Sequence, residues 1–169
     1  YLADNKRADS AFAIAFTALG FLTIENEEES STANFFHPEP KTRMERWDYG
    51  QFVNKSWASL ADSDWNSSLN LFCDLLDDYL KLKYSDSIES RDSFSYIWHR
   101  AIEDDKADVP NLLISTIRNI AERILNLDRS TFRQIIEILE SHQWDVFERI
   151  IYYLLRLNPT DTEEDIKSR

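Results

Sequence analysis

The fold is indicated most clearly by residues 142–159, which read HQWDVFERIIYYLLRLNP. When residues 144–157 are placed on a helical wheel, their apolar side chains cover an arc of about 200°. An ordinary surface helix has an apolar stripe of only about 100°. The wide arc is formed by Trp144, Val146, Phe147, Ile150, Ile151, Tyr153, Leu154, Leu155 and Leu157. A helix with so much apolar surface must contact neighbours on more than one side, so these residues predict an inner helix of a helical stack.

Other stretches with helical periodicity are of two kinds. Residues 65–84 have an apolar arc about as wide as that of 144–157, whereas the arcs of 111–127 and 130–140 are narrower. We therefore expect the two wide-arc helices to be inner and the other two to flank them. Further helices are expected at about residues 8–24 and 43–61 and from Thr160 onwards, and residues 95–105 are expected to form a short helix or an ordered turn. Ser63 or Asp64 is expected to open the helix that reaches residue 84, and Asp108 the helix that reaches residue 127.

The composition excludes most fold classes. The chain has 2 glycines and 4 prolines in 169 residues, where average usage would give roughly 12 glycines. Because hairpin turns and phosphate-binding loops depend on glycine, its scarcity argues against both. The sequence predicts an all-α fold of stacked antiparallel helical hairpins, either as a HEAT-like array or as an irregular helical bundle.

An internal similarity fits such a stack. Residues 53–76 align without gaps with residues 132–155, so that Trp65 matches Trp144. Each copy reads as a helix, a short polar turn and a tryptophan that opens the next helix. Stacked hairpins that bury their faces against each other have this design. Two copies are equally compatible with chance, because amphipathic helices align readily.

The chain is divided near its first prolines. Residues 1–40 contain the first helix and an acidic, proline-containing linker at 25–40, and residues 41–169 form the predicted helical-hairpin array. The chain opens with Tyr1 and its only methionine is Met44. We therefore expect it to be a fragment of a larger protein.

The charge and the cysteine content indicate which classes of partner and which cellular location to expect. There are 31 acidic and 19 basic residues, a formal net charge of −12, which repels phosphate backbones and argues against nucleic-acid binding. The uncharged run at 11–24 is too short to span a bilayer, so we expect no membrane association. The single Cys73 excludes an internal disulfide and favours a cytoplasmic location.

Catalytic and metal-binding motifs are absent from the sequence. It contains no HExxH, CxxC, phosphate-loop, dinucleotide-binding or nucleophile-elbow pattern. His37, His99 and His142 are scattered, and Cys73 lies in an apolar helix pattern that favours a buried thiol. We therefore predict no catalytic residue, no cofactor and no metal. The carboxylates of Asp77 and its neighbours are expected on a solvated face.

Two stretches are candidates for recognition. In WHRAIED (98–104), Trp98, Arg100 and Glu103 are the predicted partner-binding residues. The alternative is a helix surface with side-chain pairs and Trp98 in the core. The main local basic cluster is KTRMERW (41–47), which is suited to an acidic partner or to balancing the acidic run at 25–29.

The same part of the chain resembles a known family. Residues 93–108 and 139–159 are similar to helical-repeat regions of large bacterial STAND-type NTPases associated with phage defence. The resemblance is carried by Trp98, Arg100, Ala101, Ile102 and Glu103, and by Trp144, Phe147, Arg149 and Ile150. It implies a sensor or scaffold array that binds a foreign protein, with the nucleotide-binding domain elsewhere in the parent protein.

These observations favour a non-catalytic α-helical protein-interaction or scaffold module of a larger bacterial protein. Its expected partner is another protein or a second copy of itself. The alternative is a small helical enzyme or ligand-binding bundle with a cavity near Cys73 and His99. A purely structural dimerising domain is a third interpretation.

Overall fold

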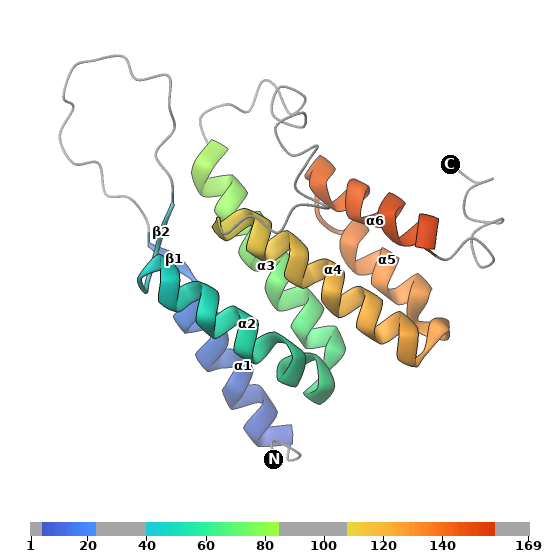
Figure 1. Ribbon diagram of the computed structural model, residues 1–169, viewed down its shortest axis with the longest axis horizontal. Helices are drawn as coiled ribbons and strands as arrows, with labels where there is room; N and C mark the ends of the chain where they lie inside the picture. Colours follow the sequence, from blue (N-terminus) through green and yellow to red (C-terminus); the bar gives the residue numbers. More distant parts are fainter. Residues whose placement is uncertain (1–4, 23–39, 85–107, 158–169) are drawn as a thin grey trace.

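The computed structural model describes residues 5–22, 40–84 and 108–157, and in these segments it confirms the all-α prediction (Figure 1). The helices are α1 (Asn5–Leu19), α2 (Arg46–Ser63), α3 (Trp65–Tyr84), α4 (Val109–Leu127), the 3-10 helix η2 (Arg129–Thr131), α5 (Phe132–Glu140) and α6 (Asp145–Leu157). One antiparallel ladder joins β1 (Phe21–Leu22) to β2 (Lys41–Thr42), with Phe21 opposite Thr42. The first helix therefore ends before residue 24, because its expected last turn pairs as a strand.

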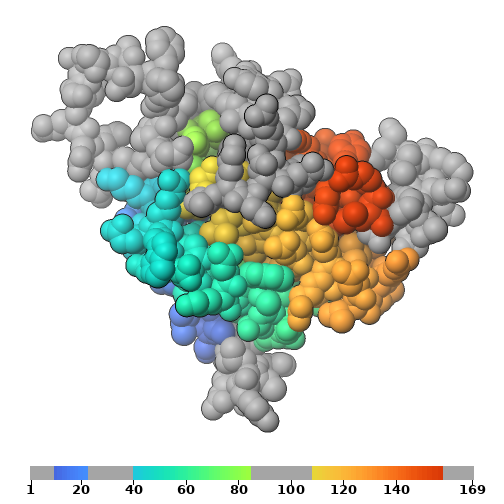
Figure 2. Space-filling view, viewed as in Figure 1, coloured from blue at the N-terminus to red at the C-terminus, as the bar shows by residue number. Residues whose placement is uncertain are grey.

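The helices form stacked antiparallel hairpins in two layers. Successive helices run in opposite directions, and α1–α2, α3–α4 and α5–α6 pack as pairs (Figure 1). Helices α1, α3 and α5 form one layer, and α2, α4 and α6 form the other. The side chains Ala15 and Leu19 of α1 lie in the same core as the rest of the stack. In the space-filling view, α4 crosses the visible face between α2 and the α5–α6 pair (Figure 2).

Aspartate residues mark the boundaries of α2, α3 and α4. The carboxylate of Asp108 accepts a hydrogen bond of 3.0 Å from the backbone N–H of Asn111, which caps α4 as its sequence predicts. A single residue, Asp64, connects α2 to α3. Its N–H donates to the Leu60 carbonyl at 3.0 Å, and its carboxylate accepts from the Ser67 N–H at 3.1 Å. Asp64 thus ends one helix and caps the next.

The predicted division into inner and flanking helices is half right. Helix α3 is inner as expected, since it packs against α1, α2, α4 and α5. Helix α4, which was expected to flank, is also inner, because Asn111 and Thr116 are buried beside its apolar residues. The apolar arc of this helix was narrow because Asn111 and Thr116 are polar and were not included in it, although both are buried. Helix α6 lies at an edge, and its Tyr152 is 56 % exposed.

The two internally similar stretches share a burial pattern. Trp65 and Trp144 are both partly buried and pack against the core. The other matched apolar positions also agree in burial, namely Val53 with Phe132, Trp57 with Ile136, Leu60 with Leu139, Leu71–Phe72 with Ile150–Ile151, and Leu75–Leu76 with Leu154–Leu155. However, the matched helices α2 and α5 lie in opposite layers. The similarity is therefore one of local packing and not of place in the stack.

Some expectations fall outside the described segments. These are the short helix or ordered turn at 95–105, the helix from Thr160 onwards and the linker at 25–40, apart from its last residue Pro40. In the segments that are described, no helix combines the length and apolar character needed to cross a membrane.

Candidate functional site

A partly open pocket of about 490 Å³ lies where the β-ladder meets three helices. Its lining comes from β1, from β2 and the residues that follow it, from the first turn of α2, from α3 and from the start of α4. The lining residues are Leu22, Pro40, Lys41, Thr42, Arg43, Met44, Glu45, Arg46, Tyr79 and Val109. We call this site the basic pocket. In Figure 2 the cyan residues that follow Pro40 lie at the left margin of the visible face.

Three cationic side chains and one carboxylate line the basic pocket. Lys41, Arg43 and Arg46 are the cations and Glu45 is the acid. Within the described residues, none of the three cations forms an ion pair. Lys41, Arg43 and Arg46 thus form a local group of cations in a chain whose formal net charge is −12.

The β-ladder fixes the positions of these cations. The pairing of Leu22 with Lys41 holds the start of the basic segment against the end of α1. The Thr42 hydroxyl donates a hydrogen bond of 2.6 Å to the carbonyl of Met44, which turns the chain after β2. A Cβ atom built on Gly20 would lie 3.6 Å from Nε of Arg43, so this guanidinium passes close to the glycine that follows α1.

Two helices begin at the basic pocket, and their amino termini differ. Helix α4 is capped by Asp108. Helix α2 has Glu45 at its N-cap position, but the Glu45 side chain accepts no hydrogen bond from the helix. The first N–H groups of α2 carry partial positive charge, and the carboxylates of Glu45 and of Asp48 in the first turn offset it.

The floor of the basic pocket is apolar and lies against the core. Tyr79 is 1 % exposed, and its ring packs edge-on against Phe21 at a centroid distance of 5.5 Å. Phe21 also contacts Tyr49, with ring centroids 6.4 Å apart. Val109 closes the floor from the start of α4. The pocket thus combines an apolar base with a cationic rim.

Tyr49 lies fully buried behind this floor. Its hydroxyl has no hydrogen-bond partner among the described residues. Burial raises the pKa of Tyr49, so the phenol stays neutral at physiological pH. Tyr49 does not line the pocket, and it acts here as packing.

Cys73 is not part of this site. It is 0 % exposed in α3, and it does not line the basic pocket. Burial raises the pKa of the Cys73 thiol, and the carboxylates of Asp74 and Asp77 raise it further. Since the thiolate is the nucleophile, the structure confirms the expected inert thiol. The other residue of the alternative cavity, His99, lies outside the described segments.

The carboxylates of α3 differ in their surroundings, and the expectation of a solvated face is wrong for Asp77, whose side chain is partly buried by Trp144. Asp77 accepts a hydrogen bond of 2.7 Å from the indole N–H of Trp144 and pairs with Lys81, so it fastens the start of α6 to α3. Asp74 and Asp78 are exposed, as expected for a solvated face. Partial burial, the main cause, raises the pKa of both.

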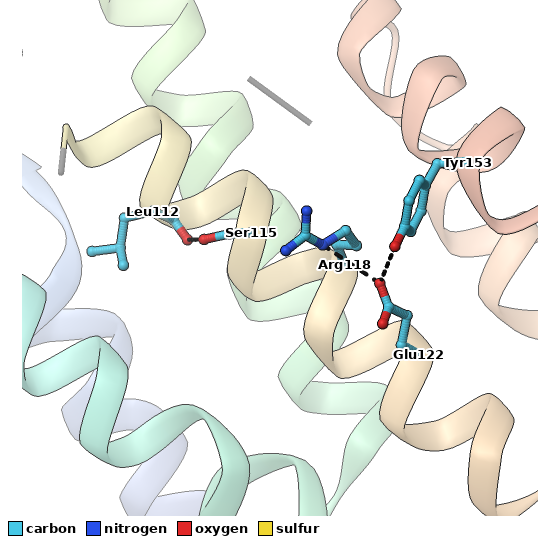
Figure 3. Close-up of polar contacts among 5 residues, drawn as sticks. All are labelled: Leu112, Ser115, Arg118, Glu122 and Tyr153. Carbon is cyan, nitrogen blue, oxygen red and sulfur yellow. Dashed lines mark hydrogen bonds and ion pairs between the residues drawn. The ribbon is translucent and has the colours of Figure 1, made fainter. Parts of the chain in front are cut away.

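A second polar contact joins α4 to α6. The hydroxyl of Tyr153 donates to the carboxylate of Glu122 at 2.8 Å, and Arg118 lies 3.5 Å from the same carboxylate oxygen (Figure 3). The guanidinium groups of Arg118 and Arg156 lie 5.7 and 5.5 Å from the centre of the Tyr153 ring. The contact is a docking feature of α6, because all its groups find partners within the stack.

The predicted partner-binding residues Trp98, Arg100 and Glu103 lie outside the described segments. The basic cluster 41–47 was visible in the sequence, but the pocket was not, because Tyr79 and Val109 come from distant parts of the chain. Over the described ranges, histidines, cysteines and carboxylates form no group that would hold a metal ion. No protein-family model, curated protein or solved structure matches this chain.

Proposed function

We propose that this chain is a non-catalytic α-helical protein-interaction module. The observation that carries the proposal is the exposure of large apolar side chains at both ends of the stack. At the first end, Trp47 is 73 % exposed, together with Ile14 and Phe16 of α1. At the other end, Tyr152 and Leu157 of α6 are exposed. Exposed aromatic residues of this kind mark protein-protein contacts more often than catalytic sites.

The chemistry of the described residues supports the same proposal. Among the described residues that line the basic pocket there is no thiol or histidine, and Glu45 is the one carboxylate. General acid–base or nucleophilic catalysis needs convergent groups with shifted pKa values. The buried Cys73, which has such a shift, lies in the packed core.

A photo-crosslinking experiment tests this function. Benzoylphenylalanine replaces Trp47 in one variant, Tyr152 in a second and the exposed polar residue Lys55 in a control. On irradiation in bacterial cells, the full chain should form a protein adduct, or a self-adduct, from Trp47 or Tyr152 but not from Lys55. Absence of adducts at both aromatic positions would overturn the proposal. A thermal-shift increase with a metal or metabolite would instead support the alternative of an enzyme or ligand-binding bundle.

We further propose that the parent protein is a bacterial STAND-type NTPase. The support is the sequence resemblance at residues 93–108 and 139–159, of which the structure describes residues 108 and 139–157. The matched side chains Trp144, Phe147 and Ile150 pack in or against the core, as residues of a helical array should. The full reading frame is the test. A phosphate-loop domain upstream would support the proposal, whereas a start codon just before Tyr1 and a stop codon after Arg169 would refute it.

A further inference from the structure

We propose that the basic pocket binds an acidic peptide segment of a partner protein. In this complex an apolar side chain of the peptide lies on the floor, and its carboxylates pair with Lys41, Arg43 and Arg46. The inference rests on the proposed interaction function and adds the site and the chemistry of the partner.

Charge complementarity is the first argument. The three cations have no ion pair within the described residues, although the chain as a whole is strongly acidic. An acidic partner is repelled by most of the surface and attracted to this end, which directs its approach.

The shape of the pocket is the second argument. A volume of about 490 Å³ exceeds what a single inorganic anion fills, and it accommodates one large side chain with neighbouring backbone. The floor of Met44, Tyr79 and Val109 is apolar, and the cations stand at the rim on flexible stems. This arrangement fits an apolar anchor with carboxylates on either side.

The backbone argues against a phosphate group as the ligand. Phosphate sites in proteins commonly use glycine-rich loops or nests in which a residue adopts a positive φ. No described residue has a positive φ. The anion-binding groups here are side chains, which suit several separate carboxylates.

The test measures peptide binding by the full chain with fluorescence anisotropy. The probe is a labelled synthetic peptide of alternating glutamate and leucine. The comparison peptides replace glutamate by glutamine, or leucine by serine. The double variant Arg43→Ser/Arg46→Ser removes two rim cations, and the matched control Lys55→Ser/Arg129→Ser removes two exposed cations elsewhere. Circular-dichroism melting checks that both variants fold.

We expect the glutamate–leucine peptide to bind, and the rim variant to weaken binding at least about tenfold, with less than about twofold for the control. Binding should fall with added salt, and the serine peptide should bind several-fold more weakly. Equal binding of the glutamine peptide, equal loss in both variants, or no binding would overturn the inference. Displacement of the peptide by pyrophosphate or by single-stranded DNA would also overturn it, in favour of a phosphate ligand. If peptide binding fails while Trp47 or Tyr152 still crosslinks a protein, the interaction function stands and only this site is refuted.

Discussion

The helix pairs α2–α3 and α5–α6 have the same local design and different surroundings. Both begin with an amphipathic helix, turn through short polar residues and continue from a partly buried tryptophan. Where they differ, α2–α3 is apolar and buried at Ala61, Leu69 and Cys73. The aligned positions of α5–α6 are exposed and occupied by Glu140, Glu148 and Tyr152. The inner pair and the edge pair thus differ in burial at a few aligned positions, although their local design is the same.

Placing the residue of the edge pair at the aligned position of the inner pair should give the largest change in the free energy of unfolding. Leu69→Glu places a carboxylate at a site that is 0 % exposed, so we expect it to lower the free energy of unfolding by about 4 kcal/mol or more. The reciprocal Glu148→Leu lies on the exposed face of α6 and should change it by less than about 0.5 kcal/mol. Urea unfolding measures both. Similar losses in the two variants would mean that α6 is as enclosed as α3.

Thiol reactivity probes the same contrast in the native state. Cys73 is buried and its pKa is raised, so it should react with a chromogenic disulfide reagent only when α3 opens. In the double variant Cys73→Ala/Tyr152→Cys, the single thiol lies at the aligned exposed position. We expect this thiol to react at least about a hundredfold faster than Cys73. Comparable rates would show that the α3 core is open to solvent.

The bond between Trp144 and Asp77 attaches the edge pair to the inner pair. Trp144→Phe keeps an aromatic ring but removes the indole N–H that donates to the Asp77 carboxylate at 2.7 Å. Hydrogen bonds to charged groups contribute roughly 1.5–3 kcal/mol, so we expect a loss in the free energy of unfolding of that order. The control is Gln134→Ala, at an exposed position of α5. Equal losses in the two variants would assign no role to the bond.

A smaller, opposite effect is expected at the first end of the stack. Tyr49→Phe removes a buried hydroxyl that has no partner among the described residues, so it should raise the free energy of unfolding by about 1 kcal/mol. Tyr153→Phe removes a hydroxyl that does have a partner, Glu122, and should lower it. Thermal unfolding of the two variants gives the signs directly. A loss at Tyr49 would show that its hydroxyl is hydrogen-bonded in solution.

The sequence was sufficient to predict where the helices lie along the chain, but it was insufficient to predict which helices contact one another. Periodicity located the helices, and the capping residue Asp108 marked the start of α4, because both signals depend on interactions within a few residues. The central place of α4 was missed, since buried Asn111 and Thr116 look like surface residues in a sequence. The β-ladder was missed because two-residue strands have no periodicity. The basic pocket needed Tyr79 and Val109 beside residues 40–46, and only the fold brings these together.

The backbone of the described segments has no residue with a positive φ, whether glycine or any other. Every one of these positions is therefore open, as far as main-chain geometry is concerned, to all amino acids of L configuration except proline. Gly50 illustrates this freedom, because a methyl group built there meets nothing within 4 Å. Backbone geometry thus places little restriction on substitution in these segments, and the restriction that remains comes from packing of the buried side chains.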